Sequence, residues 1–177
     1  MSAPEATGEF SRIVDLRQFD QAPTHIAAST AECAALARRF GLVRVEQLEA
    51  DVACTAEGAS VRVTGRVRAH IVQSCAVSAE DLPVTIDEPI AFRFVPSGTP
   101  LLATDEEGIE ITAEDCDEIA FDQGCFDLGE AVAQSMALAI DPFATGPEAD
   151  QVRASGLLGA ENTSPFAALA ALTKKED

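Results

Sequence analysis

The chain has 177 residues, of which 47% are apolar, and this length suits one globular domain with its own core and tails. It carries 12 basic and 30 acidic residues, which gives a formal net charge of −18. Nucleic acids and anionic membranes attract Lys and Arg, so this charge disfavours non-specific binding to either and favours basic partners.

The ends of the chain and its cysteines bear on where the protein works. Residues 1–9 have neither the basic nor the apolar segment of a signal peptide, and no apolar run approaches membrane-spanning length. The five cysteines are odd in number and irregularly spaced, unlike a secreted disulfide framework. We therefore expect a cytoplasmic protein, with a flexible N-terminus at 1–9, a single domain at 10–143, and a linker and C-terminal tail at 144–177.

The first clear element is a helix over residues 29–40, after a possible short strand within 10–20. Ser29 and Glu32 have the spacing of a capping box, in which each side chain bonds to the other residue's backbone N–H. Gly41 can supply a left-handed C-terminal cap. The pre-helix loop holds His25, one of only two histidines.

A long β-hairpin follows. Residues 48–56 and 61–71 alternate between apolar and polar side chains, which is typical of antiparallel strands with one buried face and one wet face. Glu57-Gly58 is the expected two-residue turn. Residues 82–95 predict a third long strand, and their two prolines favour an edge position or a bulge.

The wet face of this hairpin carries arginines and carboxylates. With the expected turn, Glu49 faces Arg66, while Asp51 lies diagonal to Arg62 and Arg66. Arg62, Arg66 and Arg68 are therefore candidate RNA contacts. Neutralisation by the neighbouring carboxylates is the favoured interpretation, and no aromatic side chain is interleaved for base stacking.

Negative charge is concentrated in one stretch. Residues 94–152 contain fourteen carboxylates and no Lys or Arg, whereas residues 1–93 hold nine arginines and thirteen carboxylates. Much of 96–126 is expected to be solvated loop, with short strands near 109–111 and 119–121. The candidate partner-binding residues in this loop are Asp105, Glu106, Glu107, Glu110, Glu114 and Asp115.

A second helix is expected over 127–140, with Asp127 as its N-cap and Glu130 in the first turn. Asp141-Pro142 ends it, because the residue before proline is disfavoured in helical geometry. The fold class is thus α+β: an antiparallel sheet with a long hairpin, two helices packed on one face, an acidic loop region and a flexible tail.

No pattern typical of an enzyme or of a cofactor site is present. The chain has no Cys-x-x-Cys pair, no phosphate-binding glycine loop and no nucleophile elbow. A small metal-binding protein or enzyme that uses Cys75, Cys116 or Cys125 is kept as an alternative. We expect no cofactor, no small-molecule substrate and no catalytic residue.

Several segments in order resemble one known family. These are 34–41, 65–77, 90–94, 126–130 (Phe-Asp-Leu-Gly-Glu), 138–143 (Leu-Ala-Ile-Asp-Pro-Phe) and 165–169 (Pro-Phe-Ala-Ala-Leu). Together they resemble the YceD-like family of large ribosomal RNA subunit accumulation proteins, in its alphaproteobacterial form, over roughly residues 8–172. Many members have a Cys-x-x-Cys-type pair where this chain has Cys75 followed by Val77 and Ser78, so no metal site is carried over.

The resemblance implies a non-enzymatic role in the synthesis, processing or stability of 23S ribosomal RNA. Combined with the acidic charge, it predicts binding to a basic ribosomal protein or a pre-50S particle, with 23S RNA contact as a further possibility. Direct RNA binding through the arginine-bearing sheet face is the alternative.

Overall fold

The structure is a computed structural model that describes residues 9–17, 22–98, 117–122 and 124–155. It separates into two compact units. Unit 1 takes its described residues from Met1–Val72 and Pro83–Ile140, and unit 2 takes them from Gln73–Leu82 and Asp141–Asp177. The domain boundaries expected from the sequence stay a prediction. In the described part of the chain, no helix is long and apolar enough to cross a membrane.

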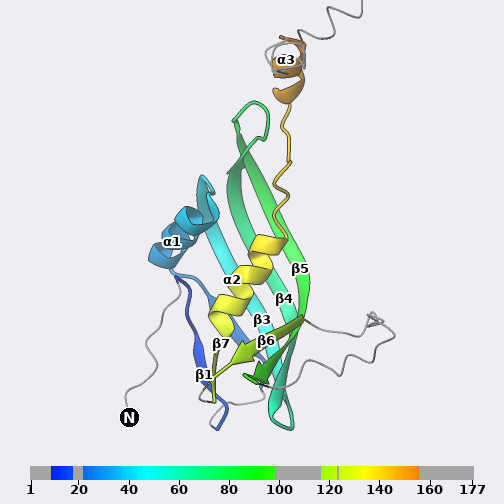
Figure 1. The fold of residues 1–177 in the computed structure, drawn as a ribbon. Coiled ribbons are helices and arrows are strands. Elements are labelled where there is room, and N and C mark those ends of the chain that lie inside the picture. Colours follow the sequence, from blue (N-terminus) through cyan, green and yellow to red (C-terminus); the bar gives the residue numbers. More distant parts are fainter. Residues whose placement is uncertain (1–8, 18–21, 99–116, 123, 156–177) are drawn as a thin grey trace, which may run out of the picture. The chain divides into compact units, whose positions relative to one another are not determined.

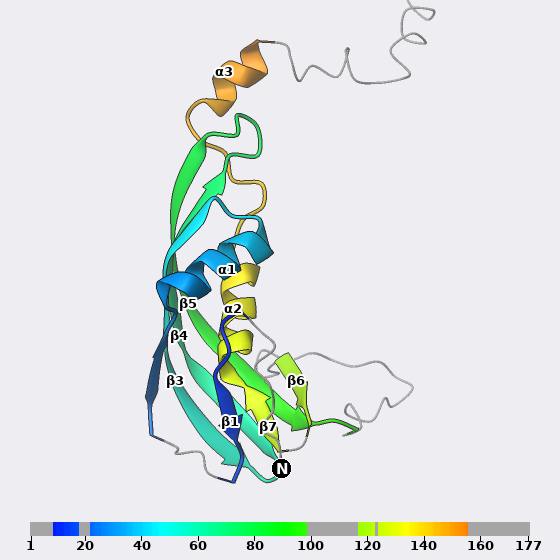
Figure 2. The same ribbon diagram turned by 90° about the vertical axis from the view of Figure 1, so that its left-hand side faces the viewer.

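Unit 1 is built on a five-stranded sheet in the order β2-β3-β4-β5-β6 (Figure 1). Its strands are β2 Thr24–Ala27, β3 Arg44–Glu57, β4 Ser60–Ser74, β5 Asp81–Pro96 and β6 Asp117–Phe121. Two helices, α1 Thr30–Phe40 and α2 Leu128–Leu138, lie on the same face of this sheet (Figure 2). The predicted α+β class and the placement of two helices on one face are confirmed.

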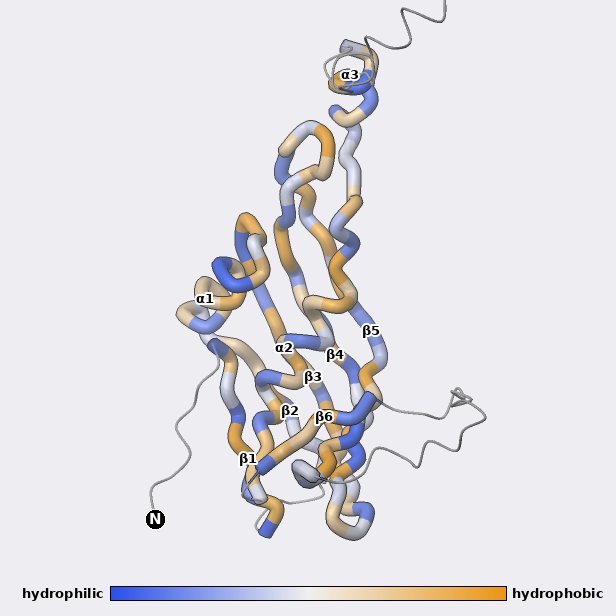
Figure 3. The backbone as a smooth tube through the Cα atoms, in the orientation of Figure 1, coloured by the Kyte–Doolittle hydropathy of each residue, from blue (hydrophilic) through white to orange (hydrophobic). Residues whose placement is uncertain are grey.

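The hairpin of β3 and β4 is longer than the predicted 48–56 and 61–71, and its turn is Gly58-Ala59, not Glu57-Gly58. Glu57 pairs with Ser60, and Gly58 has φ of 65°, a conformation that glycine adopts without steric cost. The register therefore differs from the expected one. Glu49 lies opposite Arg68, and Asp51 lies opposite Arg66. Figure 3 shows the alternation of apolar and polar residues along these strands.

The far side of the sheet departs from an all-antiparallel arrangement. β6 runs parallel to β5 and pairs with Phe92–Pro96, which confirms the strand expected near 119–121. Parallel pairing needs a crossover, and the chain between these strands has the length for one. The two prolines of β5, Pro83 and Pro89, both precede the stretch that β6 pairs. The strand expected at 109–111 lies outside the described residues.

Three short strands complete unit 1, and the sequence predicted only the one within residues 10–20. The pre-helix residues form β2, whose His25 pairs with Asp51 of β3 in register. β1 Ile13–Asp15 pairs with β7 Cys125–Asp127 in a separate two-stranded sheet. Short strands of three or four residues carry too little alternation to be read from sequence.

Local signals set the helix ends. Both bonds of the Ser29–Glu32 capping box are present, and Gly41 adopts the left-handed C-cap with φ of 65°. The Asp127 side chain accepts from the Glu130 backbone N–H at the start of α2, as predicted. Each such N-cap stabilises its helix by about 1 kcal/mol.

The core of unit 1 fills the space between the sheet and the two helices. Leu36 of α1 and Val132 of α2 have no exposed surface. Aromatic packing joins β5 to β7, where the rings of Phe94 and Phe126 stack with centroids 4.3 Å apart. Such ring pairs contribute about 1 kcal/mol beyond their buried area.

Unit 2 consists of the end of the β4–β5 hairpin and the segment that follows α2. The hairpin end is closed by a bond from the Cys75 N–H to the Glu80 carbonyl, 2.8 Å long. The chain then passes through 141–148 into a short helix, α3 Ala149–Ala154, in a region expected to be linker. The Ala76 N–H donates to the Ala144 carbonyl and so ties the two segments together.

Candidate functional site

The outward face of the sheet carries the predicted arginines. Arg62, Arg66 and Arg68 alternate along β4 with buried residues, so all three side chains lie on the same face. Their side chains are 32–47% exposed, which leaves them accessible to solvent. The structure therefore brings these three candidates together as predicted.

Each of these arginines contacts a carboxylate. Arg62 Nε donates to Glu57 Oε1 at 2.6 Å, and Arg68 Nη1 donates to Asp51 Oδ2 at 2.8 Å. Arg66 Nε donates to Asp87 Oδ1 on β5. Ion pairing on the wet face is present, as predicted, but through other partners: Glu49 and Asp51 contact Arg68, while Arg62 contacts Glu57 and Arg66 contacts Asp87.

The contacts join into a network. Arg68 also lies 3.8 Å from Glu49 and from Asp87, and His25 Nδ1 lies 2.8 Å from Asp51. Hydrogen bonds from His25 and Arg68 lower the pKa of Asp51. The bond from Arg66 lowers the pKa of Asp87 in the same way. These carboxylates therefore stay ionised at neutral pH and continue to neutralise the arginines.

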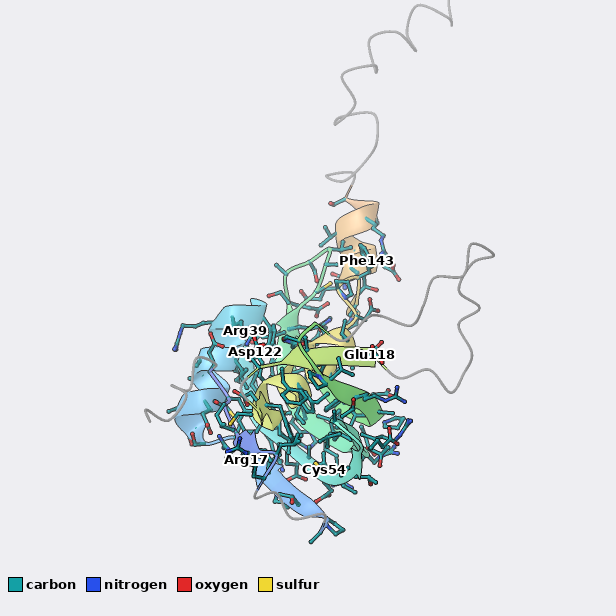
Figure 4. The ribbon with its side chains drawn as sticks, turned by 60° about the horizontal axis from the view of Figure 1, so that its bottom comes forward. Arg17, Arg39, Cys54, Glu118, Asp122 and Phe143 are labelled. Carbon is teal, nitrogen blue, oxygen red and sulfur yellow. The ribbon has the colours of Figure 1, made fainter. Side chains whose placement is uncertain are left out.

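Arg93 of β5 extends the network along the same face of the sheet towards β6. It was not among the residues predicted from the sequence. It sits between buried Phe92 and Phe94 on β5, lying 3.4 Å from Glu57 and 3.4 Å from Glu118 of β6. Its alternation with two phenylalanines was the available signal, because it places Arg93 on the wet face. Figure 4 marks Glu118 on its strand.

The contacts of this network leave no excess of positive charge on the sheet face. Four arginines, Arg62, Arg66, Arg68 and Arg93, contact five carboxylates, Glu49, Asp51, Glu57, Asp87 and Glu118. Excess positive charge is what attracts phosphates and releases their counterions. This set has none, so the arginine-bearing face is a poor phosphate-binding surface in its paired state.

The candidate partner-binding carboxylates belong to the acidic loop before β6. Asp105, Glu106, Glu107, Glu110, Glu114 and Asp115 all lie outside the described residues. The flanking strand β6 adds Asp117 and Glu118, both exposed or nearly so. The role of the loop in partner binding stays a prediction.

The cysteines offer one unusual environment. Cys75 is buried in unit 2, and its Sγ accepts backbone N–H groups from Val77, Ser78 and Gly146 at 3.3–3.4 Å. Burial raises the pKa of this thiol, but bonds from the Ser78 side chain and from those N–H groups outweigh it and lower the pKa to about 7. Gly146 lies far along the chain, so sequence gave no sign of it.

The other described cysteines are ordinary thiols. Burial raises the pKa of Cys33 and Cys54, and Cys125 is half-buried. Cys116 lies outside the described residues. Within the residues that the structure describes, no three His, Cys, Asp or Glu side chains are grouped so that they could hold a metal ion.

Comparison with known proteins adds the family. Residues 63–173 match the family model described as large ribosomal RNA subunit accumulation protein YceD. This stretch includes most of β4, all of β5 and α2, and the described part of unit 2. No curated protein and no solved structure gives a match. Because the family model covers more than half of the chain, this protein belongs to the YceD family of large ribosomal RNA subunit accumulation proteins.

Proposed function

We propose that the protein is a non-enzymatic factor in the synthesis, processing or stability of 23S ribosomal RNA, and that it acts by binding a basic ribosomal protein or a pre-50S particle. The family supports a role in accumulation of the large-subunit RNA. The observation that carries the mode of action is the sheet face, on which each candidate RNA-contacting arginine contacts a carboxylate.

Electrostatics favour a protein partner over naked RNA. The chain has a net charge of −18, and RNA is itself a polyanion. Ribosomal proteins that contact RNA need basic surfaces, and such surfaces are complementary to an acidic chain. Long-range attraction of this kind accelerates encounter between the partners and weakens as salt rises.

The test is affinity purification of the tagged full-length chain from cells that produce it, with protein and RNA both identified. We expect large-subunit ribosomal proteins together with 23S precursors. After RNase treatment, the ribosomal proteins should remain bound if protein contacts suffice. Absence of both components would contradict the proposed function.

A salt titration separates this proposal from direct RNA binding. We expect weak binding of the purified chain to naked 23S RNA, with a change of no more than about twofold in the Arg62→Gln, Arg66→Gln, Arg68→Gln triple variant. Arg38→Gln, an exposed arginine of α1, controls for loss of charge elsewhere. Tight, salt-sensitive binding that the triple variant alone abolishes would establish RNA as the ligand and contradict the protein-binding mode.

A further inference from the structure

Unit 2 exposes one large aromatic side chain. Phe143 is 81% exposed, whereas the described phenylalanines of unit 1 include several that are buried almost completely. Figure 4 marks it on the segment that leads to α3. Burying a phenylalanine side chain stabilises a fold or a complex, and the folded chain leaves that free energy unused. A single exposed apolar residue is common on protein surfaces, so exposure alone decides nothing.

The backbone that carries Phe143 is held on both sides. Its own N–H donates to Asp141 Oδ1 at 2.8 Å, and the residue before it, Pro142, has a restricted φ. The Asp141 carbonyl accepts from buried Gln73 Nε2 at 2.9 Å. On the other side, the Ala144 carbonyl accepts from the Ala76 N–H at 3.0 Å.

Further along the segment, the Gly146 N–H donates to the Cys75 sulfur, and the Glu148 N–H donates to Glu80 Oε1 at 3.0 Å. The segment is thus bound at four points to the end of the β4–β5 hairpin, all within unit 2. An aromatic side chain on such a backbone loses little conformational entropy on binding, which is the property of a preorganised anchor.

The charges of unit 2 define what this anchor suits. Its described residues include five carboxylates and one cation, Arg153, which contacts Asp150 at 2.9 Å. Four of the five are exposed: Asp141, Glu148 and Asp150 belong to the same segment as Phe143, and Asp81 lies at the hairpin end to which that segment is bound. Protein-binding hot spots usually combine an aromatic centre with polar surroundings, and exposed carboxylates on the same segment favour a basic partner.

We propose that Phe143 anchors a docking surface of unit 2 for a basic protein that has an apolar pocket within its basic surface. This rests on the proposed function and names the surface through which the ribosomal partner is bound. A second copy of the chain is disfavoured as occupant because both copies carry the same large negative charge.

The experiment compares full-length wild type with Phe143→Ala, Phe143→Leu and a matched control, Leu138→Ala. Leu138 is an equally exposed apolar residue, 83% exposed, and belongs to unit 1. Both alanine variants remove exposed side chains, so thermal unfolding should be unchanged in each. The probe is the RNA-free protein fraction of the large ribosomal subunit from the same cells, titrated over the immobilised chain.

We expect Phe143→Ala to weaken binding of the retained basic proteins by about tenfold or more, and Leu138→Ala to weaken it by less than about twofold. Phe143→Leu keeps a large apolar side chain and should retain most of the wild-type affinity. Equal binding by wild type and Phe143→Ala would overturn the anchor while leaving the proposed function intact. Failure of wild type to bind any ribosomal protein would overturn the anchor and, with it, a free ribosomal protein as the partner in the proposed function. Loss of self-association in Phe143→Ala, measured by sedimentation, would assign the surface to a second copy and overturn the proposal.

Discussion

The guanidinium of Arg12 donates two hydrogen bonds to the carboxylate of Glu32, 2.6 and 3.1 Å long. Glu32 is also the residue whose side chain accepts from the Ser29 N–H in the capping box of α1. On the other side, the Arg12 N–H donates to Asp127, the N-cap of α2, at 2.8 Å. One residue of the N-terminal segment therefore joins the N-terminal ends of both helices.

Glu32→Gln should destabilise the protein by about 1–3 kcal/mol, because a charge-assisted bidentate pair and a cap are both weakened. The hydrogen bond from Arg12 is the largest effect on the pKa of Glu32, which is lowered from an ordinary 4.5 to about 2. A lowered carboxyl pKa stabilises the fold above the unfolded value, and this contribution is lost as pH falls from 4.5 to 2. Denaturant unfolding of wild type across that window should show a steeper loss of stability than in Glu32→Gln. Parallel pH profiles would contradict this account.

Gly129→Ala should destabilise unit 1 by about 2 kcal/mol or more, although alanine normally favours a helix. A β-carbon at Gly129 would lie 2.4 Å from the Phe10 carbonyl oxygen and 2.9 Å from the Arg12 nitrogen, both of them backbone atoms. The segment that joins the two helix ends would have to move. Thermal unfolding is the measurement, with Gln134→Ala on the exposed side of the same helix as control. Equal melting temperatures for wild type and Gly129→Ala would show that the segment yields without cost.

Elements with strong local signals were predictable from sequence. The capping box and Gly41 gave the ends of α1, because they satisfy backbone groups within a few residues. Alternation gave the long strands of the hairpin and the outward face of its arginines. The register was wrong because turn chemistry decides between Glu57-Gly58 and Gly58-Ala59, and one residue at the turn changes every cross-strand pair.

Features that depend on distant segments were not predictable. β2 forms because residues 24–27 pair with β3, which is distant in sequence. The parallel direction of β6 depends on how the chain returns to β5. Arg66 contacts Asp87 of another strand, and Cys75 accepts a hydrogen bond from Gly146, which lies 71 residues further along the chain. A sequence pattern records the periodicity of one segment, and it carries no information about which other segment packs against it.

Ser78→Ala should raise the pKa of Cys75 above its value of about 7, because the Ser78 side chain is one of the donors that lower it. Ultraviolet absorbance of the thiolate should show a titration step near pH 7 in wild type. The step should move to higher pH in Ser78→Ala, and the step near pH 7 should be absent in Cys75→Ser. Since the ordinary thiol pKa is near 9, the folded state releases this proton first, and stability should rise between pH 7 and 9. A Cys75 that titrates near pH 9 would show that its sulfur is not held by these N–H groups.

The double variant Asp51→Asn, Asp87→Asn should bind naked 23S RNA more tightly than wild type. These two carboxylates neutralise Arg66 and Arg68, so their removal frees positive charge on the sheet face. Solvent-exposed ion pairs contribute little to stability, so the fold should persist.

The measurement for this variant is the slope of log binding constant against log salt, which should steepen by about 1–2, one unit for each phosphate newly contacted. The control is Asp141→Asn, Glu148→Gln in unit 2, which changes net charge by the same amount but frees no arginine of the sheet. Equal gains in the two double variants would mean that net charge alone weakens RNA binding. A gain confined to the sheet-face variant would show that the carboxylates of β3 and β5 act locally, by occupying arginines that would otherwise bind phosphate.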